Sequence, residues 1–277
     1  TKSSAASDVY KRQRFGLPPL DAFEGLSVTD VEKWIGPELR HGAMELSIVG
    51  DVDRETVVRL ATRYLGSLPE RGVNEPKAND RTGPVFPVAR QMDVPVMSQI
   101  KKAQLIMAFP TDDIWDISRT RRLNILAEIV SERLRLRIRE KLGAAYSPGA
   151  FSWPSRTYPG YGLFVIYIPL SPETLDIVTA EVKAIVLDIR QKGVSSAELK
   201  RALEPTLTGI KDRLRENGYW LNTVLSGASQ HPVQLEWCRS ITTDYAGIRK
   251  ADIERLARRY LDLSKLAVIQ ATSAGVP

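Results

Sequence analysis

Residues 133–148 read R-L-R-L-R-I-R-E-K-L-G-A-A-Y-S-P. Apolar side chains recur every three or four residues along this stretch and the segment before it, at the spacing of one buried helix face: Leu123, Ala127, Val130, Leu134 and Ile138. Gly143 follows a basic last turn, which marks a helix C-terminus because cations favour the negative helix end and glycine tolerates a left-handed cap. The pattern predicts a long helix over 114–142, a tight turn, and a strand over 146–153.

Arg139 and Tyr146 are the candidate functional pair of the chain. Arg139 would end the helix and Tyr146 would follow the turn, so the two residues would lie on neighbouring backbone. A fixed cation beside a phenolic hydroxyl can hold a carbonyl or a developing oxyanion. Arg137 is the alternative cation if the helix ends slightly earlier. The competing interpretation is a plain amphipathic helix with a solvated arginine run at 133, 135, 137 and 139, and with Tyr146 in the core.

The string R-E-K-L-G-A-A-Y-S-P resembles the arginine–tyrosine motif in the C-terminal half of M16-type zinc metallopeptidases, the insulinase/pitrilysin family. The likeness covers about residues 15–277. It implies an α+β fold, in which M16-type domains pack an antiparallel or mixed sheet against helices. It also implies that Arg139 and Tyr146 reach across a closed chamber to a peptide substrate bound at zinc in the N-terminal half.

Composition and charge exclude several other classes. The formal net charge of +6 is modest, and the Lys and Arg residues do not form a block with interleaved aromatic residues, so a nucleic-acid partner is not expected. The longest apolar runs are too short for a membrane span. The single cysteine, Cys238, excludes an internal disulfide, and its apolar neighbours predict a small buried residue rather than a nucleophile.

Four segments are expected along the chain. Residues 1–13 are low in apolar residues and are expected to be a non-native or disordered tail, in which case the chain is the end of a longer gene product. Residues 14–70 are predicted to be the C-terminal part of a truncated M16-like domain. Residues 71–87, rich in Pro, Gly, Asn and charge, would be a linker. Residues 88–277 would form a complete C-terminal-type domain.

Helix start signals occur in both predicted domains. Ser27 with Asp30 forms a capping-box pattern, Asp53 can cap the next helix, and a strand is expected between these helices over 43–49. In the second domain, strands are predicted over 92–96, 103–109 and 161–168, and a final strand over 266–271. Asp112 and Asp113 are expected to cap the long helix.

Further helices of the second domain have clear limits. Ser171-Pro172 starts one helix and Gly193 ends it. Ser195 with Glu198 starts the next helix, which Pro205 should break or kink.

One short repeat links the two domains. D-V-E-K-W from Asp30 corresponds to D-I-E-R-L from Asp252, and each is followed at the same spacing by an apolar segment, beginning at Met44 and at Leu266. The repeat predicts that the same closing helix–strand unit ends both domains.

The residues do not support a metal site in this chain. The resemblance implies catalysis through an H-x-x-E-H helix with two His ligands and a Glu acting on metal-bound water. The chain has two histidines, His41 and His231, and neither begins that motif. His41 is expected at a helix end and His231 in a loop. Zinc is therefore expected in the N-terminal half, outside this chain, which alone should be inactive.

Three functions remain open at this stage. The first is the C-terminal substrate-binding portion of a zinc-dependent M16 metalloendopeptidase, paired with an N-terminal half on the same polypeptide or on a partner subunit. The second is a non-catalytic M16-like scaffold that pairs with a separate zinc-bearing subunit. The third is a peptide-binding α/β domain unrelated to proteolysis. Similarity to bacterial single-chain members makes the periplasm the expected location.

Overall fold

The computed structural model describes residues 20–71, 83–145 and 147–274. The chain divides into two compact units, residues 1–78 and 79–277, and this division falls inside the segment 71–87 predicted as a linker. The predicted tail 1–13 lies outside the described residues. The exact limits of tail, linker and domains stay predictions.

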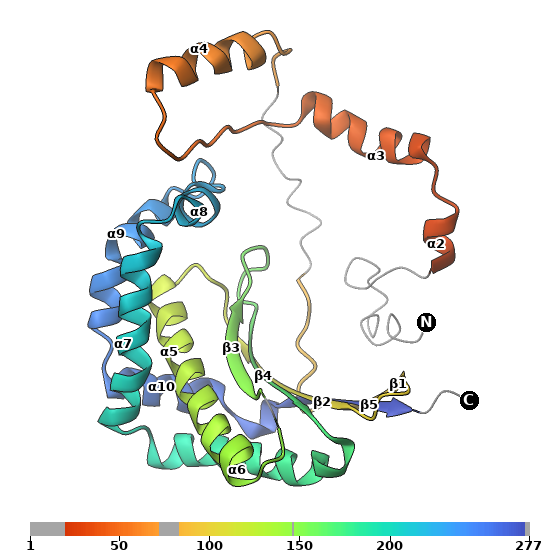
Figure 1. The fold of residues 1–277 in the computed structure, drawn as a ribbon, viewed down its shortest axis with the longest axis vertical. Coiled ribbons are helices and arrows are strands. Elements are labelled where there is room, and N and C mark those ends of the chain that lie inside the picture. The colour runs from red at the N-terminus through yellow and green to blue at the C-terminus, as the bar shows by residue number, and fades with distance from the viewer. Residues whose placement is uncertain (1–19, 72–82, 146, 275–277) are drawn as a thin grey trace. The chain divides into compact units, whose positions relative to one another are not determined.

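The first unit contains the helices α2 (Leu20–Glu24), α3 (Val28–His41) and α4 (Arg54–Leu65) (Figure 1). The predicted capping box is confirmed: Ser27 Oγ accepts the Asp30 N–H at 3.2 Å, and the Asp30 carboxylate accepts the Ser27 N–H at 3.0 Å. Asp53 caps α4 by accepting the Thr56 N–H at 2.8 Å. These helix starts follow from local chemistry, since each cap satisfies backbone donors that the helix itself cannot.

The strand predicted over 43–49 is wrong. This segment has no regular secondary structure, and its apolar side chains Met44, Leu46 and Ile48 are 53%, 54% and 42% exposed. A strand needs a second backbone to accept and donate its hydrogen bonds. The described residues of the first unit provide no such partner for the alternating pattern.

The second unit is built on a five-stranded mixed sheet in the order β1-β5-β2-β4-β3. The strands are β1 (Gln91–Met97), β2 (Ala103–Thr111), β3 (Gly149–Pro154), β4 (Gly162–Leu170) and β5 (Ala267–Ala274). β1 runs parallel to β5, and the other pairs are antiparallel. The predicted α+β class is confirmed.

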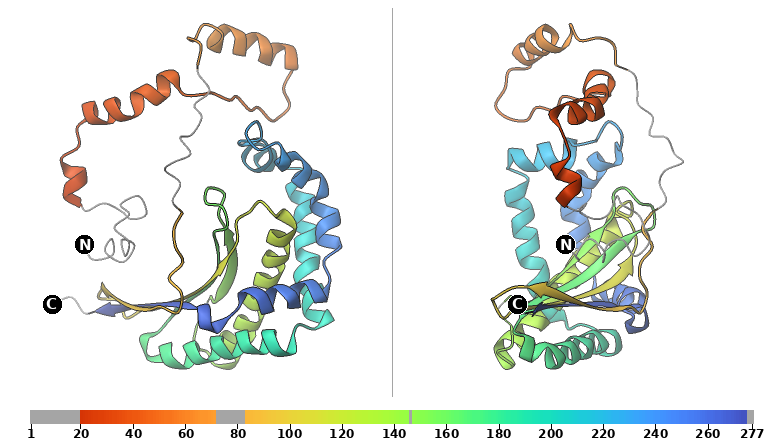
Figure 2. Two further views of the ribbon diagram at one scale, coloured as in Figure 1. Left: turned by 180° about the vertical axis from the view of Figure 1, so that it is seen from behind. Right: turned by 90° about the vertical axis from the view of Figure 1, so that its right-hand side faces the viewer.

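The two faces of this sheet differ. In β2, Ala103, Leu105, Met107 and Phe109 are buried, whereas the alternating residues are more accessible. The buried face packs against α5, α6 and α10, and these helices lie on one side of the sheet (Figure 2). Most of the core therefore sits between one sheet face and the helices.

The helical elements of this unit are α5 (Ile117–Leu134), the π-helix η3 (Arg135–Lys141), the 3₁₀ turn η4 (Pro172–Thr174), α6 (Leu175–Lys192), α7 (Ser196–Arg213), α8 (Asn217–Tyr219), the π-helix η5 (Trp220–Leu225), α9 (Val233–Ala246), α10 (Lys250–Tyr260) and the 3₁₀ turn η6 (Leu263–Lys265). The predicted face at positions 123, 127, 130, 134 and 138 is buried, as expected.

The predicted start of the long helix needs correction. Asp116 caps α5 by accepting the Arg119 N–H at 2.9 Å. Asp113 instead accepts the backbone N–H groups of Trp115 and Gly160, at 3.1 and 2.6 Å. Asp112 accepts the Tyr260 hydroxyl from α10. The two aspartates thus hold the turn after β2 to neighbouring segments, which sequence spacing does not reveal.

Pro205 does not break its helix, which was one of the two predicted outcomes; the other outcome, a kink, stays a prediction. α7 continues through it to Arg213. Proline removes one backbone hydrogen bond and crowds the preceding turn, at a cost of about 3 kcal/mol. Packing of α7 against α5 and α9 offsets this cost.

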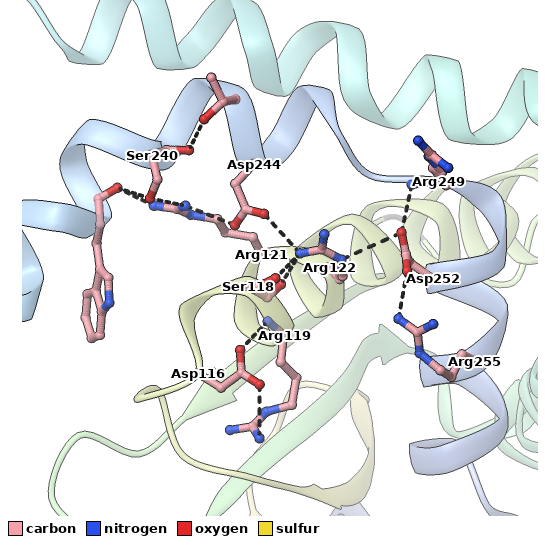
Figure 3. A network of polar contacts seen from close by, with 12 residues as sticks. Asp116, Ser118, Arg119, Arg121, Arg122, Ser240, Asp244, Arg249, Asp252 and Arg255 are labelled. Carbon is pink, nitrogen blue, oxygen red and sulfur yellow. Dashed lines mark hydrogen bonds and ion pairs between the residues drawn. The ribbon is translucent and has the colours of Figure 1, made fainter.

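A buried polar network joins α5 to α9 and α10 (Figure 3). Arg121, only 4% exposed, donates to Asp244 at 3.0 Å, to Ser240 at 3.1 Å, and to the Trp237 carbonyl. Arg122 pairs with Asp244 at 3.1 Å and lies 3.8 Å from Asp252. This network holds α9 against α5, which itself contacts the sheet.

Candidate functional site

The predicted turn after the long helix is confirmed. Gly143 has a φ of +62°, its N–H donates to the Arg139 carbonyl at 3.2 Å, and the Ala144 N–H donates to the Ile138 carbonyl at 3.1 Å. A Cβ at Gly143 would meet no atom within 4 Å, so the requirement for glycine is conformational rather than steric. The helix end that carries Arg139 is therefore closed by its own backbone.

The arginine run is only partly the solvated surface that one interpretation predicted, since Arg135 and Arg139 are exposed whereas Arg133 and Arg137 are partly buried. Arg133 is 14% exposed, contacts Glu198 at 2.6 Å and donates to the Gly193 carbonyl at 2.9 Å. Arg137 pairs with Glu181 of α6. These contacts hold Arg133 and Arg137 against the helical layer, because acidic residues distant in sequence lie beside them. Arg137, the alternative cation of the site, is thus engaged by α6.

Glu198 is held ionised by this arrangement. Burial by itself would raise its pKa, but hydrogen bonds from Arg133 and from Ser195 outweigh burial and lower the pKa to about 2. The same carboxylate accepts the Ser195 N–H at 2.7 Å in the confirmed capping box of α7. The ion pair between Arg133 and Glu198 therefore joins α5 to the start of α7.

Arg139 lines a cavity of about 740 Å³ at the end of the β2–β4 pair. The cavity wall comes from the β1–β2 loop, β2, β4 and the turn after η3, and includes Lys101, Lys102, Gln104, Gly143 and Leu170. The two lysines were not singled out by sequence reasoning, because they precede a strand and belong to no motif. Only the fold brings them to the same cavity as Arg139.

Tyr146, the other half of the predicted pair, lies outside the described residues. Its neighbour Ala145 is buried and forms an isolated antiparallel bridge with Leu170. Ser147 lines the same cavity as Arg139. The pairing of Arg139 with Tyr146 remains a prediction from the sequence.

A second cavity, of about 970 Å³, lies between α5, α7 and the edge strand β3. Two of its cations form ion pairs: Arg201 contacts Glu132 at 2.6 Å and Arg135 contacts Glu140. The adjoining strand edge is also occupied, since the Ser131 hydroxyl accepts the Ala150 N–H at 2.8 Å and donates to the Ala150 carbonyl at 3.2 Å. Ser131 takes the place of a neighbouring strand at that position.

The described residues do not fit a zinc ion. His41 is the last residue of α3 in the first unit, whereas His231 lies in a loop of the second unit with its ring 4.4 Å from that of Trp115. Over residues 20–71, 83–145 and 147–274, His, Cys, Asp and Glu side chains form no group of three that could hold a metal ion. Cys238 is partly exposed rather than buried, which corrects the sequence prediction.

Comparison with known proteins identifies the family. Residues 26–205, more than half of the chain, match the family described as "Peptidase M16 inactive domain". The chain belongs to the M16 peptidase family. An uncharacterized zinc protease of Rickettsia felis is 30% identical over 219 residues, which are 76% of this chain and 48% of that protein. The M16 chain described here thus spans about half the length of this relative.

Solved M16-like structures share the fold. A protease from Helicobacter pylori has a TM-score of 0.72 and 13% identity, over 93% of this chain and 62% of that one. The periplasmic protease PqqL from Escherichia coli has a TM-score of 0.63 and 19% identity, over 82% of this chain and 25% of that one. These similarities support the α+β M16 architecture. Separately, the helices within the described ranges include none that is long and apolar enough to span a membrane.

Proposed function

We propose that this chain is the substrate-binding, non-catalytic portion of a zinc-dependent M16 endopeptidase. The observation that carries the proposal is the position of Arg139, which lines a cavity at the end of the sheet. In this role, Arg139 and Tyr146 hold a carbonyl of the substrate. A cation and a phenolic hydroxyl directed at that oxygen stabilise charge that develops on it.

The helix-free side of the sheet would contact the rest of the peptide. By strand register, Phe151 lies opposite Val165, which lies opposite Ala108, and Trp153 lies opposite Leu163. Ala108 alternates with the buried Met107 and Phe109, so this row belongs to the other face of the sheet. Phe151 and Trp153 are 45% and 65% exposed. Exposed aromatic side chains on an open sheet offer apolar contacts to an extended peptide.

The remaining parts of the enzyme would be supplied by an N-terminal half that carries H-x-x-E-H and zinc, on the same polypeptide or on a partner subunit. The two halves would enclose the peptide in a chamber. The name of the Rickettsia relative as a zinc protease supports this division of labour. The periplasm is the proposed location, in line with the description of PqqL as periplasmic.

A non-catalytic scaffold is the second candidate. It is favoured by the description of the matched family as an inactive domain. In that case the chain would stabilise a zinc-bearing subunit without contacting its substrate. The two functions differ in whether Arg139 and Tyr146 affect turnover.

The test uses the intact assembly, in which this chain is combined with its H-x-x-E-H half. Arg139→Met and Tyr146→Phe should each lower kcat/KM for a peptide substrate, Arg139→Met by about a hundredfold, because a preorganised donor is lost. The melting temperature should change little, since methionine keeps much of the length of arginine and phenylalanine keeps the ring of tyrosine. Arg135→Met is the matched control, because Arg135 is an exposed residue of the same π-helix.

Two results would contradict the proposal. Unchanged kinetics in both variants would exclude the substrate-holding role and favour the scaffold. Equal losses in Arg135→Met and Arg139→Met would show a general effect of charge or of helix stability rather than a specific contact.

A further inference from the structure

We propose that the cavity around Arg139 recognises a carboxylate of the bound peptide, either its C-terminal carboxylate or an acidic side chain. This inference rests on the proposed function, since it assigns a chemical class to the substrate of the same site.

Three cationic side chains from two segments of the chain line this cavity. Lys101 and Lys102 come from the β1–β2 loop, and Arg139 comes from η3. The described residues of the lining include neither Asp nor Glu. Lining of one sign within a concave, partly apolar wall raises the local concentration of the opposite charge. An anionic group is therefore the favoured occupant.

The two lysines extend from a backbone that the sheet fixes. The Ser98 N–H donates to the Ala274 carbonyl at 3.2 Å, and the Ser273 N–H donates to the Lys102 carbonyl at 3.0 Å. Ala103, directly after Lys102, is buried at 2% exposure. Both lysine side chains are exposed, and neither forms an ion pair with another described residue. The loop thus places two ammonium groups at the cavity without an acidic partner in the described structure.

The rest of the wall suits the end of a peptide. Leu170 and Ala145 are 7% and 8% exposed and form an apolar part of the lining, while Gln104 offers an exposed amide. A volume of about 740 Å³ accommodates a few amino-acid residues. The larger cavity beside α7 provides a contrast, because its lining includes the acidic residues Glu128, Glu132 and Glu204. Of these two cavities, the one around Arg139 has a lining with several cations and no described acidic residue.

The experiment measures binding of short fluorescent peptides to the full chain by anisotropy. One N-acetylated core of alanine, serine, threonine and valine is made with a free C-terminal carboxylate, with a C-terminal amide, and with an amide plus one internal glutamate. The first peptide tests recognition of a C-terminal carboxylate, and the peptide with the internal glutamate tests recognition of an acidic side chain. At least one of them should bind about tenfold more tightly than the neutral amide, which corresponds to two partly enclosed ion pairs.

The double variant Lys101→Met/Lys102→Met should remove this preference and leave binding of the neutral amide unchanged. Methionine keeps much of the length of lysine and removes its charge. Lys211→Met/Lys265→Met is the matched control: both lysines are exposed, neither lines the cavity, and the net charge changes equally. Added salt should weaken the preference in the wild type and in the control.

The outcomes separate this inference from the proposed function. Equal binding of all three peptides, unaffected by the lysine changes, overturns the carboxylate site while peptide binding stands. If both double variants lose the preference for carboxylate-bearing peptides, net charge alone explains that preference. This result also overturns the carboxylate site. If none of the peptides binds, both the carboxylate site and the substrate-binding role fail.

Discussion

The helix α3 and the helix α10 carry the same short motif in different surroundings. Each has an aspartate in its first turn whose carboxylate accepts the N–H at the helix start, at 3.0 Å from Ser27 and at 3.1 Å from Arg249. After α10, the chain enters the central region of the sheet as β5, whereas the segment after α3 forms no strand. The two segments start their helices with the same contact, but only the segment after α10 pairs with other strands.

Burial shows the size of this difference. Ile253 and Leu256 of α10 are 0% and 6% exposed, whereas Val31 and Trp34 at the matching positions of α3 are 45% and 79% exposed. The same holds for the following segment, where Leu266 is 6% exposed and Met44 is 53% exposed. A capped amphipathic helix therefore forms in both places. Only the helix that meets a sheet gains the free energy of burial.

The largest expected effect tests this contrast directly. Ile253→Ala should lower the free energy of unfolding by about 3 kcal/mol, because it removes fully buried atoms and leaves a cavity. Val31→Ala, at the matching position, should change it by less than about 0.5 kcal/mol. Urea unfolding followed by circular dichroism measures both values. Similar losses in the two variants would mean that the face of α3 is buried in solution.

A smaller effect concerns the acidic residues of the helix starts. Glu198 and Asp30 both complete capping boxes, but only Glu198 also receives a guanidinium from another helix, that of Arg133. The pKa of Glu198 is lowered to about 2 from an ordinary value near 4.5, so its charge stabilises the folded state fully above about pH 4.5. That stabilisation is lost as the pH falls toward 2.

Glu198→Gln isolates this charge, since glutamine can still accept the Ser195 N–H. At pH 7 the variant should be less stable than the wild type by about 2 kcal/mol, and the difference should shrink steadily between pH 5 and pH 2. Chemical unfolding at several pH values measures the difference. A difference that does not depend on pH would exclude the ion pair as its cause.

The smallest expected effect compares the two aspartates of the repeat. Asp252→Ala should lower the free energy of unfolding by about 1 kcal/mol, because it removes a cap and the contacts with Arg122 and Arg255, at 3.8 and 2.7 Å. Asp30→Ala removes only a local cap and should lower the overall unfolding free energy by less. Its effect should instead appear as reduced helical circular dichroism. An equal loss in both variants would show that the tertiary contacts of Asp252 contribute nothing measurable.

Most of the successful sequence predictions concern structures whose cause lies within a few residues. The capping residues Ser27, Asp53 and Ser195 and the left-handed turn at Gly143 all follow from groups that are adjacent along the chain. The buried face of α5 was also predicted, since its periodicity depends only on helix geometry. The resemblance to M16 peptidases added the family, which the match over residues 26–205 supports.

Three of the errors share one physical origin. Arg133 was expected to be solvated, Asp112 to cap a helix, and residues 43–49 to form a strand. In each case the outcome depends on groups distant in sequence: Glu198 holds Arg133, Tyr260 donates to Asp112, and residues 43–49 find no partner strand among the described residues of their unit. The candidate site follows the same rule, because Lys101 and Lys102 reach it only through the pairing of β2 with β4 and β5.

The amino-acid sequence by itself determined several helix caps and the turn at Gly143, which faces are apolar, and which family the chain resembles. Those properties depend on backbone donors, rotamers and side-chain spacing over a few residues. Tertiary structure alone decided which apolar faces are buried, which arginines are paired, and which cations share a cavity with Arg139. Ion pairs and strand ladders join atoms from distant parts of the chain, so their energies exist only once the fold has brought those atoms together.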